Sequence, residues 1–247
     1  NGLCRYIASN EKFEKIPLPV NSSQSNLFVN SLLEDTGRQC IWIGTEGYLF
    51  QYFPSTGQMK QTEAFHNNSI KSLALDGNGY LLAGTDNGLY VYHNDVTPLQ
   101  HIIHDSRNIQ SLTNNIIWNI FADQEHNIWL GTDYGISLSR YNSALQFIPI
   151  SQITGTGDGN QFYSLFRDSK GFYWFGGTYG LIRFTDPAGD KHNAIWYRMG
   201  DKTYPLSHNR IRHIYEDKEQ QLWIATDGSI NRYDYATRQF VHYNIVD

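Results

Sequence analysis

Five aspartates recur in this sequence at intervals of forty to fifty residues, and aspartate is a residue type that can do chemistry: Asp35, Asp76, Asp123, Asp168 and Asp217. Carboxylates in pairs cleave glycosidic bonds, and single ones accept hydrogen bonds in tight turns. Residues that repeat in register serve the structure that the repeats share, so we interpret these aspartates as turn residues. Paired catalytic carboxylates stay an alternative, because spatial neighbours in a repeat protein can be far apart in sequence.

Residues that differ from repeat to repeat are free to form a site. Five and seven positions before the aspartates they include two aromatic and two basic residues, and two more tyrosines lie in later turns. Aromatic rings suit the apolar face of a sugar ring, and arginines suit its hydroxyl groups. We predict that these residues bind an oligosaccharide at one mouth of a channel, although each alone could simply fill space between sheets. The six candidate residues are Trp118, Tyr163, Arg210, Arg212, Tyr134 and Tyr179.

Other chemistry has weak support. Residues Gly155 to Gly159 are similar to a phosphate loop, but no strand-to-helix context follows and the P-loop lysine is missing. Asp76 to Gly79 is similar to a calcium loop without its later glutamate. The histidines, His208 and His213 among them, lack ligand spacing. We predict no catalytic residue, no metal site and no cofactor.

The elements that would position these residues follow from a repeated four-residue phrase that comes after each aspartate. The five copies are Trp42-Ile43-Gly44-Thr45, Leu82-Ala83-Gly84-Thr85, Trp129-Leu130-Gly131-Thr132, Trp174-Phe175-Gly176-Gly177 and Trp223-Ile224-Ala225-Thr226. Each unit divides into four short strand-like segments separated by turns, and none keeps a helical apolar period. Four strands in forty-odd residues predict the blade of a β-propeller. The Trp would pack between blades, and its neighbouring Gly would let another backbone approach.

We therefore expect an all-β chain, a β-propeller fragment of about five and a half four-stranded antiparallel blades from a larger ring of seven. Asn1-Gly2-Leu3 matches Asn87-Gly88-Leu89, so the first residues correspond to the third and fourth strands of a blade that begins upstream. The expected boundaries are a half blade at 1–20 and blades at about 26–66, 67–104, 112–151, 159–200 and 207–247.

Composition narrows the classes of partner. Among 247 residues, 19 are Lys or Arg and 24 are Asp or Glu, and the basic residues are scattered, so we expect no direct contact with nucleic acid. The sequence contains no run of eighteen apolar residues, so we expect no membrane span in this segment. Cys4 and Cys40 fall on neighbouring units and form either a disulfide or two free thiols. Exposed blade edges invite pairing between chains, so a homodimer is expected.

The repeat resembles that of the two-component regulator propeller family, most closely in residues 115–141 and 209–234, with departures at Leu82, Gly177 and Ala225. The resemblance implies the periplasmic sensor region of a hybrid two-component system in gut-dwelling Gram-negative bacteria. Such a region is the ectodomain of an inner-membrane receptor, senses oligosaccharides and signals through a histidine kinase to transcription. Its partners would be the rest of the receptor chain and a second copy.

The alternative is a carbohydrate-active β-propeller enzyme, either a glycosidase or a lyase. The turn from Asp168 to Trp174 is similar to a sialidase Asp-box, but its glycine lies one residue too far along. We therefore predict a non-catalytic sensor.

Overall fold

The regular structure of the chain consists of β-strands. The computed structural model describes residues 2–19, 27–61, 68–93, 97–141, 145, 147–149, 160–185, 194–203 and 205–243. These residues form 22 strands and no helix, which confirms the predicted all-β class. The chain divides into two compact units, Asn1–Ile102 and Ile103–Asp247, and each is described by itself.

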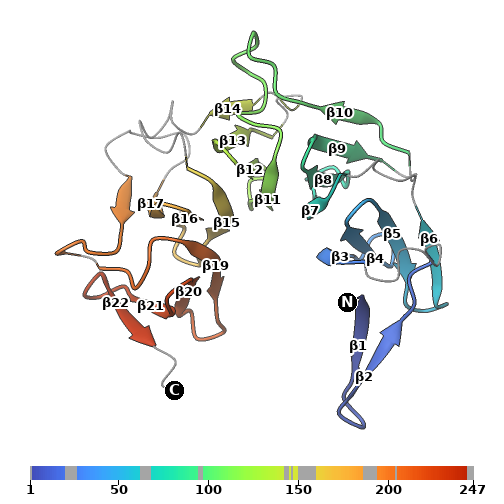
Figure 1. Cartoon of the computed structure of the whole chain (residues 1–247), viewed down its shortest axis with the longest axis horizontal. Coiled ribbons are helices and arrows are strands. Elements are labelled where there is room, and N and C mark those ends of the chain that lie inside the picture. Colours follow the sequence, from blue (N-terminus) through green and yellow to red (C-terminus); the bar gives the residue numbers. More distant parts are fainter. Residues whose placement is uncertain are drawn as a thin grey trace. The chain divides into compact units, whose positions relative to one another are not determined.

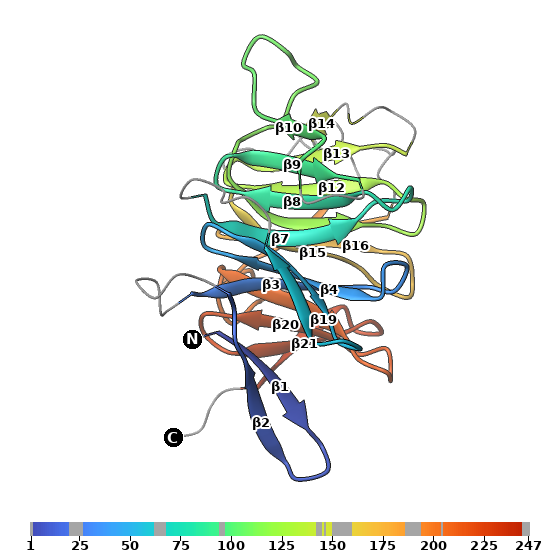
Figure 2. The same cartoon turned by 90° about the vertical axis from the view of Figure 1, so that its right-hand side faces the viewer.

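The first unit holds a hairpin and two four-stranded antiparallel sheets (Figure 1). The hairpin pairs β1 (Leu3–Ile7) with β2 (Lys12–Ile16). One sheet has the order β3 (Val29–Asp35), β4 (Cys40–Thr45), β5 (Leu49–Phe53) and β6 (Gln58–Gln61). The other has the order β7 (Ile70–Leu75), β8 (Leu81–Thr85), β9 (Gly88–Tyr92) and β10 (Gln100–Ile102). Figure 2 shows β7, β8 and β9 side by side in chain order.

The second unit holds three more four-stranded antiparallel sheets. The first contains β11 (Ile117–Ala122), β12 (Ile128–Thr132), β13 (Gly135–Ser139) and β14 (Phe147–Pro149). The next contains β15 (Phe162–Arg167), β16 (Tyr173–Gly177), β17 (Gly180–Phe184) and β18 (Ile195–Tyr197). The last contains β19 (Ile211–Glu216), β20 (Leu222–Thr226), β21 (Ile230–Asp234) and β22 (Gln239–Tyr243). Repeated four-stranded antiparallel sheets are the predicted propeller blades, so this part of the fold prediction is confirmed.

Aromatic residues of the repeated phrase fill the space between consecutive sheets. Trp129 is fully buried, and its ring centroid lies 5.1 Å from that of Tyr173 in the following sheet. Trp174 is also fully buried and meets Tyr233 edge-on at 4.9 Å. A buried aromatic side chain removes about 150–250 Å² from water, so these contacts are the main apolar joints between sheets.

The glycine of the phrase is needed for the same joint. A Cβ on Gly176 would lie 2.4 Å from Ile211 Cγ2 of the following sheet, and one on Gly131 would lie 2.6 Å from the Phe162 carbonyl oxygen. Both distances are too short for a real Cβ, which confirms that the glycine allows close approach.

The repeated aspartates are turn residues, as predicted. Asp168 Oδ1 accepts hydrogen bonds from the backbone N–H groups of Lys170 (3.0 Å) and Phe172 (2.8 Å). Its Oδ2 accepts one from Trp174 Nε1 at 2.8 Å. Asp123 and Asp217 repeat this arrangement with their own turns and indoles. The carboxylate therefore anchors both the turn and the core indole.

In the second unit the aspartate also receives a hydroxyl from the next sheet. Tyr173 Oη donates to Asp123 Oδ2 at 3.1 Å, and Tyr235 Oη donates to Asp168 Oδ2 at 2.7 Å. Each of these carboxylates thus belongs to the polar contacts of two consecutive sheets.

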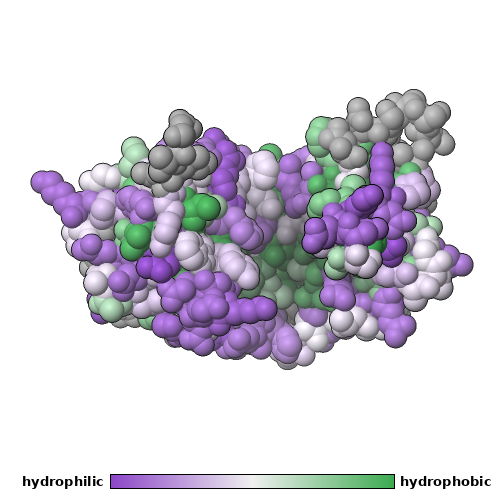
Figure 3. All heavy atoms as spheres, turned by 90° about the horizontal axis from the view of Figure 1, so that it is seen from below, coloured by the Kyte–Doolittle hydropathy of each residue, from purple (hydrophilic) through white to green (hydrophobic). Residues whose placement is uncertain are grey.

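Hydrophilic side chains predominate on the face of the chain shown in Figure 3, where hydrophobic residues form scattered patches. The described residues form no helix long and apolar enough to cross a membrane.

Candidate functional site

In each four-stranded sheet of the described residues, the register between the first and second strands skips one residue of the first strand. In all five four-stranded sheets of the described chain, the register shifts by one residue directly after the strand's first position. Such a β-bulge re-aims a side chain and is frequent beside functional sites. The bulged residues are Asn30, Lys71, Trp118, Tyr163 and Arg212. Three of the six predicted ligand-binding residues therefore occupy this position.

Four bulged residues contact the residue that directly follows the repeated phrase in their own sheet. The pairs are Lys71 with Asp86 (2.8 Å), Trp118 with Asp133 (3.0 Å), Tyr163 with Thr178 (3.1 Å) and Arg212 with Asp227 (2.5 Å). The first sheet departs from this rule, because Asn30 Nδ2 donates to Ser69 Oγ of the next sheet at 2.9 Å. The bulge and the turn between the second and third strands thus place their polar groups at one end of each sheet.

In the second unit these groups form a continuous row, which we call the bulge row: Trp118, Asp133, Gln161, Tyr163, Thr178, Arg210, Arg212 and Asp227. The rings of Trp118 and Tyr163 meet edge-on, with centroids 5.3 Å apart. Gln161, just before β15, links the same two sheets, because its Nε2 donates a hydrogen bond to Oδ1 of Asp133, in the turn after β12, at 2.7 Å. Arg210 Nη2 then donates to Tyr163 Oη at 3.4 Å. The row therefore runs across β11, β15 and β19.

Two arginines share one carboxylate at the end of the row. Arg212 contacts both oxygens of Asp227, whereas Arg210 Nη1 lies 3.9 Å from Asp227 Oδ2. The pKa of Asp227 is lowered, first of all because Arg212 donates hydrogen bonds to it. Arg210 Nε is buried and has no hydrogen-bond partner in the described part of the chain. An unpaired buried donor costs free energy, so Arg210 Nε is a local cost of this arrangement.

The remaining two candidates lie apart from these contacts. Tyr134 and Tyr179 sit in the turns after β12 and β16, with exposed fractions of 55% and 58%. Each directly follows a member of the bulge row, Asp133 or Thr178, but among the described residues no hydrogen bond or ring contact is seen between either ring and the row. The structure therefore brings together four of the six candidates, namely Trp118, Tyr163, Arg210 and Arg212. Whether any of the six binds a ligand stays a prediction.

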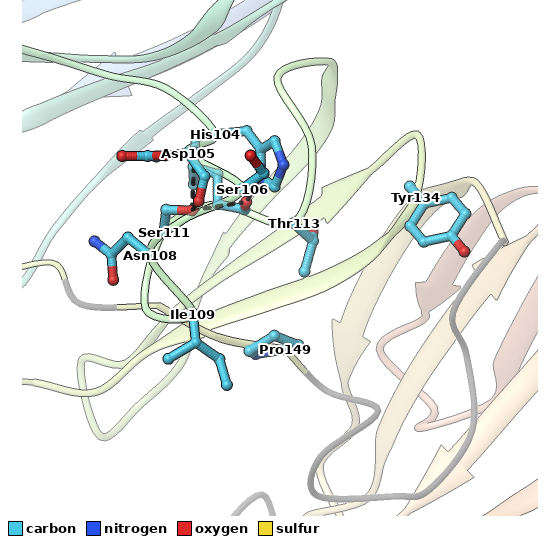
Figure 4. Close-up of a pocket in the computed structure, with 10 residues that line it drawn as sticks. His104, Asp105, Ser106, Asn108, Ile109, Ser111, Thr113, Tyr134 and Pro149 are labelled. Carbon is cyan, nitrogen blue, oxygen red and sulfur yellow. Dashed lines mark hydrogen bonds between the residues drawn. The ribbon is translucent and has the colours of Figure 1, made fainter.

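Tyr134 instead borders an open cavity of about 390 Å³ beneath the connector that precedes β11 (Figure 4). The polar groups of this connector mostly hold its own turn. Ser111 Oγ donates to the Asp105 carbonyl at 2.9 Å and accepts from the Asp105 N–H at 3.0 Å. The Asp105 carboxylate is in turn paired with Arg107.

Other predicted features have simple structural roles where they are described. His208 Nδ1 accepts a hydrogen bond from the Arg210 N–H at 3.0 Å, so it belongs to the turn before β19. Cys4 is exposed and Cys40 is buried, and both are free thiols. Burial raises the pKa of Cys40. No group of three His, Cys, Asp or Glu side chains that could hold a metal occurs among the described residues, and residues Gly155 to Gly159 lie outside them.

Comparisons with known proteins place this geometry in a family context. The profile of the two component regulator propeller matches residues 111–134, 156–179 and 205–228. A curated relative, histidine kinase P4 of Formosa agariphila, is 26% identical over 231 residues, which are 84% of this chain and 16% of the relative.

Solved structures extend the comparison. The extracellular domain of BT4673 from B. thetaiotaomicron, described both as a one component and as a hybrid two component system, is 93% identical over the whole chain, with a TM-score of 0.55. This chain covers 33% of that domain. Virginiamycin B lyase from Staphylococcus aureus is 13% identical over 98% of this chain and 76% of its own, with a TM-score of 0.71, a likeness of fold alone. The chain thus spans a third or less of the length of BT4673's domain and of the curated kinase.

Proposed function

Because this chain carries the repeats of the two-component regulator propeller family, we propose that it is part of the extracytoplasmic sensor of a hybrid two-component system. In this proposal it is itself non-catalytic, lies in the periplasm as part of the ectodomain of an inner-membrane receptor, and regulates transcription through a histidine kinase. The near-identity with an extracellular domain and the likeness to a histidine kinase support this assignment. The rest of the receptor chain and a second copy are the proposed partners.

We further propose that the ligand is an oligosaccharide and that the bulge row binds it. The observation that carries this proposal is the chain of contacts from Trp118 through Tyr163 to Arg210, built from positions that differ between repeats. The row offers aromatic rings for the apolar faces of sugars and arginine donors for their hydroxyl groups. Its two arginines are balanced by two aspartates, Asp133 and Asp227, and this balance suits an uncharged polar ligand.

Sensing requires more than binding, because a ligand shifts a receptor only if it binds two receptor states with different affinity. In this proposal the row spans three consecutive sheets, so a ligand across it would favour one spacing of those sheets over another. The likeness to virginiamycin B lyase concerns the fold alone, so we propose no lyase activity for this chain.

The test is calorimetric titration of the intact ectodomain with a broad panel of oligosaccharides. A binding sugar should lose about tenfold or more in affinity with Trp118→Ala or Arg210→Gln, equivalent to about 1.4 kcal/mol or more. The matched control is Tyr141→Ala, because Tyr141 is exposed and lies at the opposite end of its sheet, where its N–H contacts Asn127. Silence of the whole panel would contradict oligosaccharide sensing, and equal losses in all three variants would contradict the assignment of the row.

A further inference from the structure

Gln161 contacts three other members of the bulge row, although it is not one of the six predicted candidates. They are Asp133, Tyr163 and Thr178. Gln161 lies seven positions before Asp168, and the equivalent residues of the other repeats are Phe28, Ser69, Ile116 and Arg210. A side-chain amide thus occurs at this position in one repeat of the five, which is the pattern expected of a residue that serves a site rather than the shared fold.

The orientation of the Gln161 amide follows from its neighbours. The atom that lies 2.7 Å from Asp133 Oδ1 is the amide nitrogen, because a carboxylate oxygen only accepts hydrogen bonds. The amide oxygen then faces two hydroxyl groups, Tyr163 Oη at 2.5 Å and Thr178 Oγ1 at 3.0 Å. Since a carbonyl oxygen also only accepts, the Tyr163 proton lies between Oη and Gln161. The Thr178 proton points either to Gln161 or to Tyr163 Oη at 3.1 Å, and it stays within the row in both cases.

The hydrogen bonds of this part of the row therefore all run toward Asp133. Arg210 Nη2 donates to Tyr163 Oη at 3.4 Å, and Tyr163 donates to Gln161. Gln161 in turn donates to Asp133 Oδ1. Trp118 reaches the same oxygen from the preceding strand, because its Nε1 donates to Asp133 Oδ1 at 3.0 Å. The indole N–H, one amide N–H and both hydroxyl protons thus already point at acceptors inside the row.

Most of what this half of the row offers a ligand is therefore acceptors. Oδ2 of Asp133 has no hydrogen-bond partner within the described ranges of the chain, and Thr178 Oγ1 keeps lone pairs. Gln161 adds one further amide N–H. All three side chains are half-buried, so a bound molecule can reach them. A ligand group that donates hydrogen bonds finds partners here, whereas an anionic group meets the negative charge of Asp133.

The other half of the row has the opposite character. Arg210 and Arg212 are donors only, and the single carboxylate of Asp227 lies beside both of them. This half therefore carries one more positive than negative charge. The row has a direction, from acceptors around Gln161 to donors around the arginines.

We propose that Gln161 is a specificity-determining residue of the sugar site, and that its half of the row selects a saccharide unit with free hydroxyl groups over one with a carboxylate or sulfate. The hydroxyl groups of a neutral sugar donate to Asp133 Oδ2 and Thr178 Oγ1, whereas an acidic group has no proton to donate there. An acidic unit is also repelled by the Asp133 charge. The inference rests on the proposed function and adds to it the direction of the hydrogen bonds.

The test is titration of the intact ectodomain with matched pairs of oligosaccharides. The members of a pair share linkage and ring stereochemistry, but in one of them the CH₂OH group of every unit is oxidised to a carboxylate. Cellotetraose and mannotetraose, each against its uronate form, are two such pairs. The neutral member should bind about tenfold or more tightly at neutral pH. Because every unit is oxidised, an acidic unit faces Asp133 whichever way the chain lies.

Gln161→Leu should reduce this preference to about threefold or less, because the released hydroxyl groups of Tyr163 and Thr178 can then donate to an acidic ligand. The matched control is Gln124→Leu. Gln124 lies in the turn between β11 and β12, at the opposite end of β12 from Asp133, where its oxygen accepts from Arg167 at 3.4 Å. This control should keep the full preference.

Thr178→Val is a second variant, which keeps the shape of the side chain and removes the hydroxyl acceptor. It should weaken binding of the neutral sugar by about threefold or more and leave binding of the uronate form unchanged. An equal loss for both sugars would contradict the acceptor role of Thr178 and with it the inference.

Equal binding of neutral and oxidised sugars by the unchanged ectodomain would overturn the selectivity and leave the sugar site standing. A full preference in Gln161→Leu would show that the charge of Asp133 alone sets the selectivity, and the role of Gln161 would be wrong. Silence of every pair would overturn the sugar site itself and the selectivity with it, so failure of this inference and failure of the proposed function can be told apart.

Discussion

Replacing Asp168 by Asn tests whether the repeated carboxylate stabilises the sheets through the core indole. The substitution keeps one oxygen for the N–H groups of Lys170 and Phe172, but it turns an amide N–H toward Trp174 Nε1. Two donors then face each other in a site where the Trp174 side chain is fully buried.

The magnitude follows from the bond that is lost. A hydrogen bond to a charged group contributes about 1.5–3 kcal/mol, and a buried donor left unpaired costs about 1–3 kcal/mol. Both figures describe partly the same lost hydrogen bond, so they are not added in full. We expect Asp168→Asn to lower the free energy of unfolding by about 2–4 kcal/mol. Tyr235 moderates the loss, because its hydroxyl can accept from the new amide.

The chain provides its own matched control at Asp76. That carboxylate accepts from the N–H groups of Asn78 and Tyr80, but Leu82 stands where the other repeats have the indole. Asparagine is also a good turn residue, so Asp76→Asn should cost about 1 kcal/mol or less. Urea denaturation followed by circular dichroism measures both changes. At a slope of about 2 kcal/mol/M, the midpoint should fall by about 1–2 M for Asp168→Asn. Equal midpoints for the two variants would refute this account of the carboxylate.

Two further predictions concern the joint between sheets and the response to acid. Gly176→Ala should lower the free energy of unfolding by about 1–3 kcal/mol in the same urea assay, because the new Cβ meets the Ile211 side chain, and an unchanged midpoint would contradict the close approach. The pKa of Asp217 is lowered, chiefly because the Trp223 indole donates to it, so its stabilisation is present above the carboxyl's unfolded pKa of about 3.9 and is lost as the pH falls through the lower folded value. The stability gap between the wild type and Asp217→Asn should therefore be present at neutral pH and close only as the pH falls below about 3.9, and a gap independent of pH would count against this sign.

Much of the fold could be predicted from the sequence, because equivalent positions of the five repeated units can be compared with one another. Constant positions were correctly interpreted as turn and packing residues, as Asp168 and Gly176 illustrate. The four-residue phrase fixed the second strand of each unit, and the turns on either side fixed its neighbours. Local chemistry decides these features, and local chemistry is visible in sequence.

The bulge was not predicted, although the signal was present. A bulged residue keeps its place in the run of strand-forming residues, so the pattern around Trp118 does not reveal that the strand register skips this position. Its contact with Asp133 could have been found by comparing two variable positions across the repeats, because Lys71 pairs with Asp86 and Arg212 with Asp227 in the same way.

Contacts between sheets were harder to predict, because they join residues about one repeat apart. The contacts of Trp118 with Tyr163 and of Tyr163 with Arg210 depend on how consecutive sheets stack. The sequence also did not indicate that the rings of Tyr134 and Tyr179 are exposed and make no ring contact with Trp118 or Tyr163, since turn residues can point in several directions.

The shared carboxylates have a consequence for how such proteins evolve. Asp168 takes a hydroxyl from Tyr235 of the following sheet, just as Asp123 takes one from Tyr173. The sheet that contains Asp168 and Tyr173 thus brings an acceptor to one neighbour and a donor to the other. The sheet of β15 to β18 holds both groups, so duplicating the gene segment that encodes it would set Asp168 of one copy beside the Tyr173 hydroxyl of the next, and the array could lengthen with this contact already present.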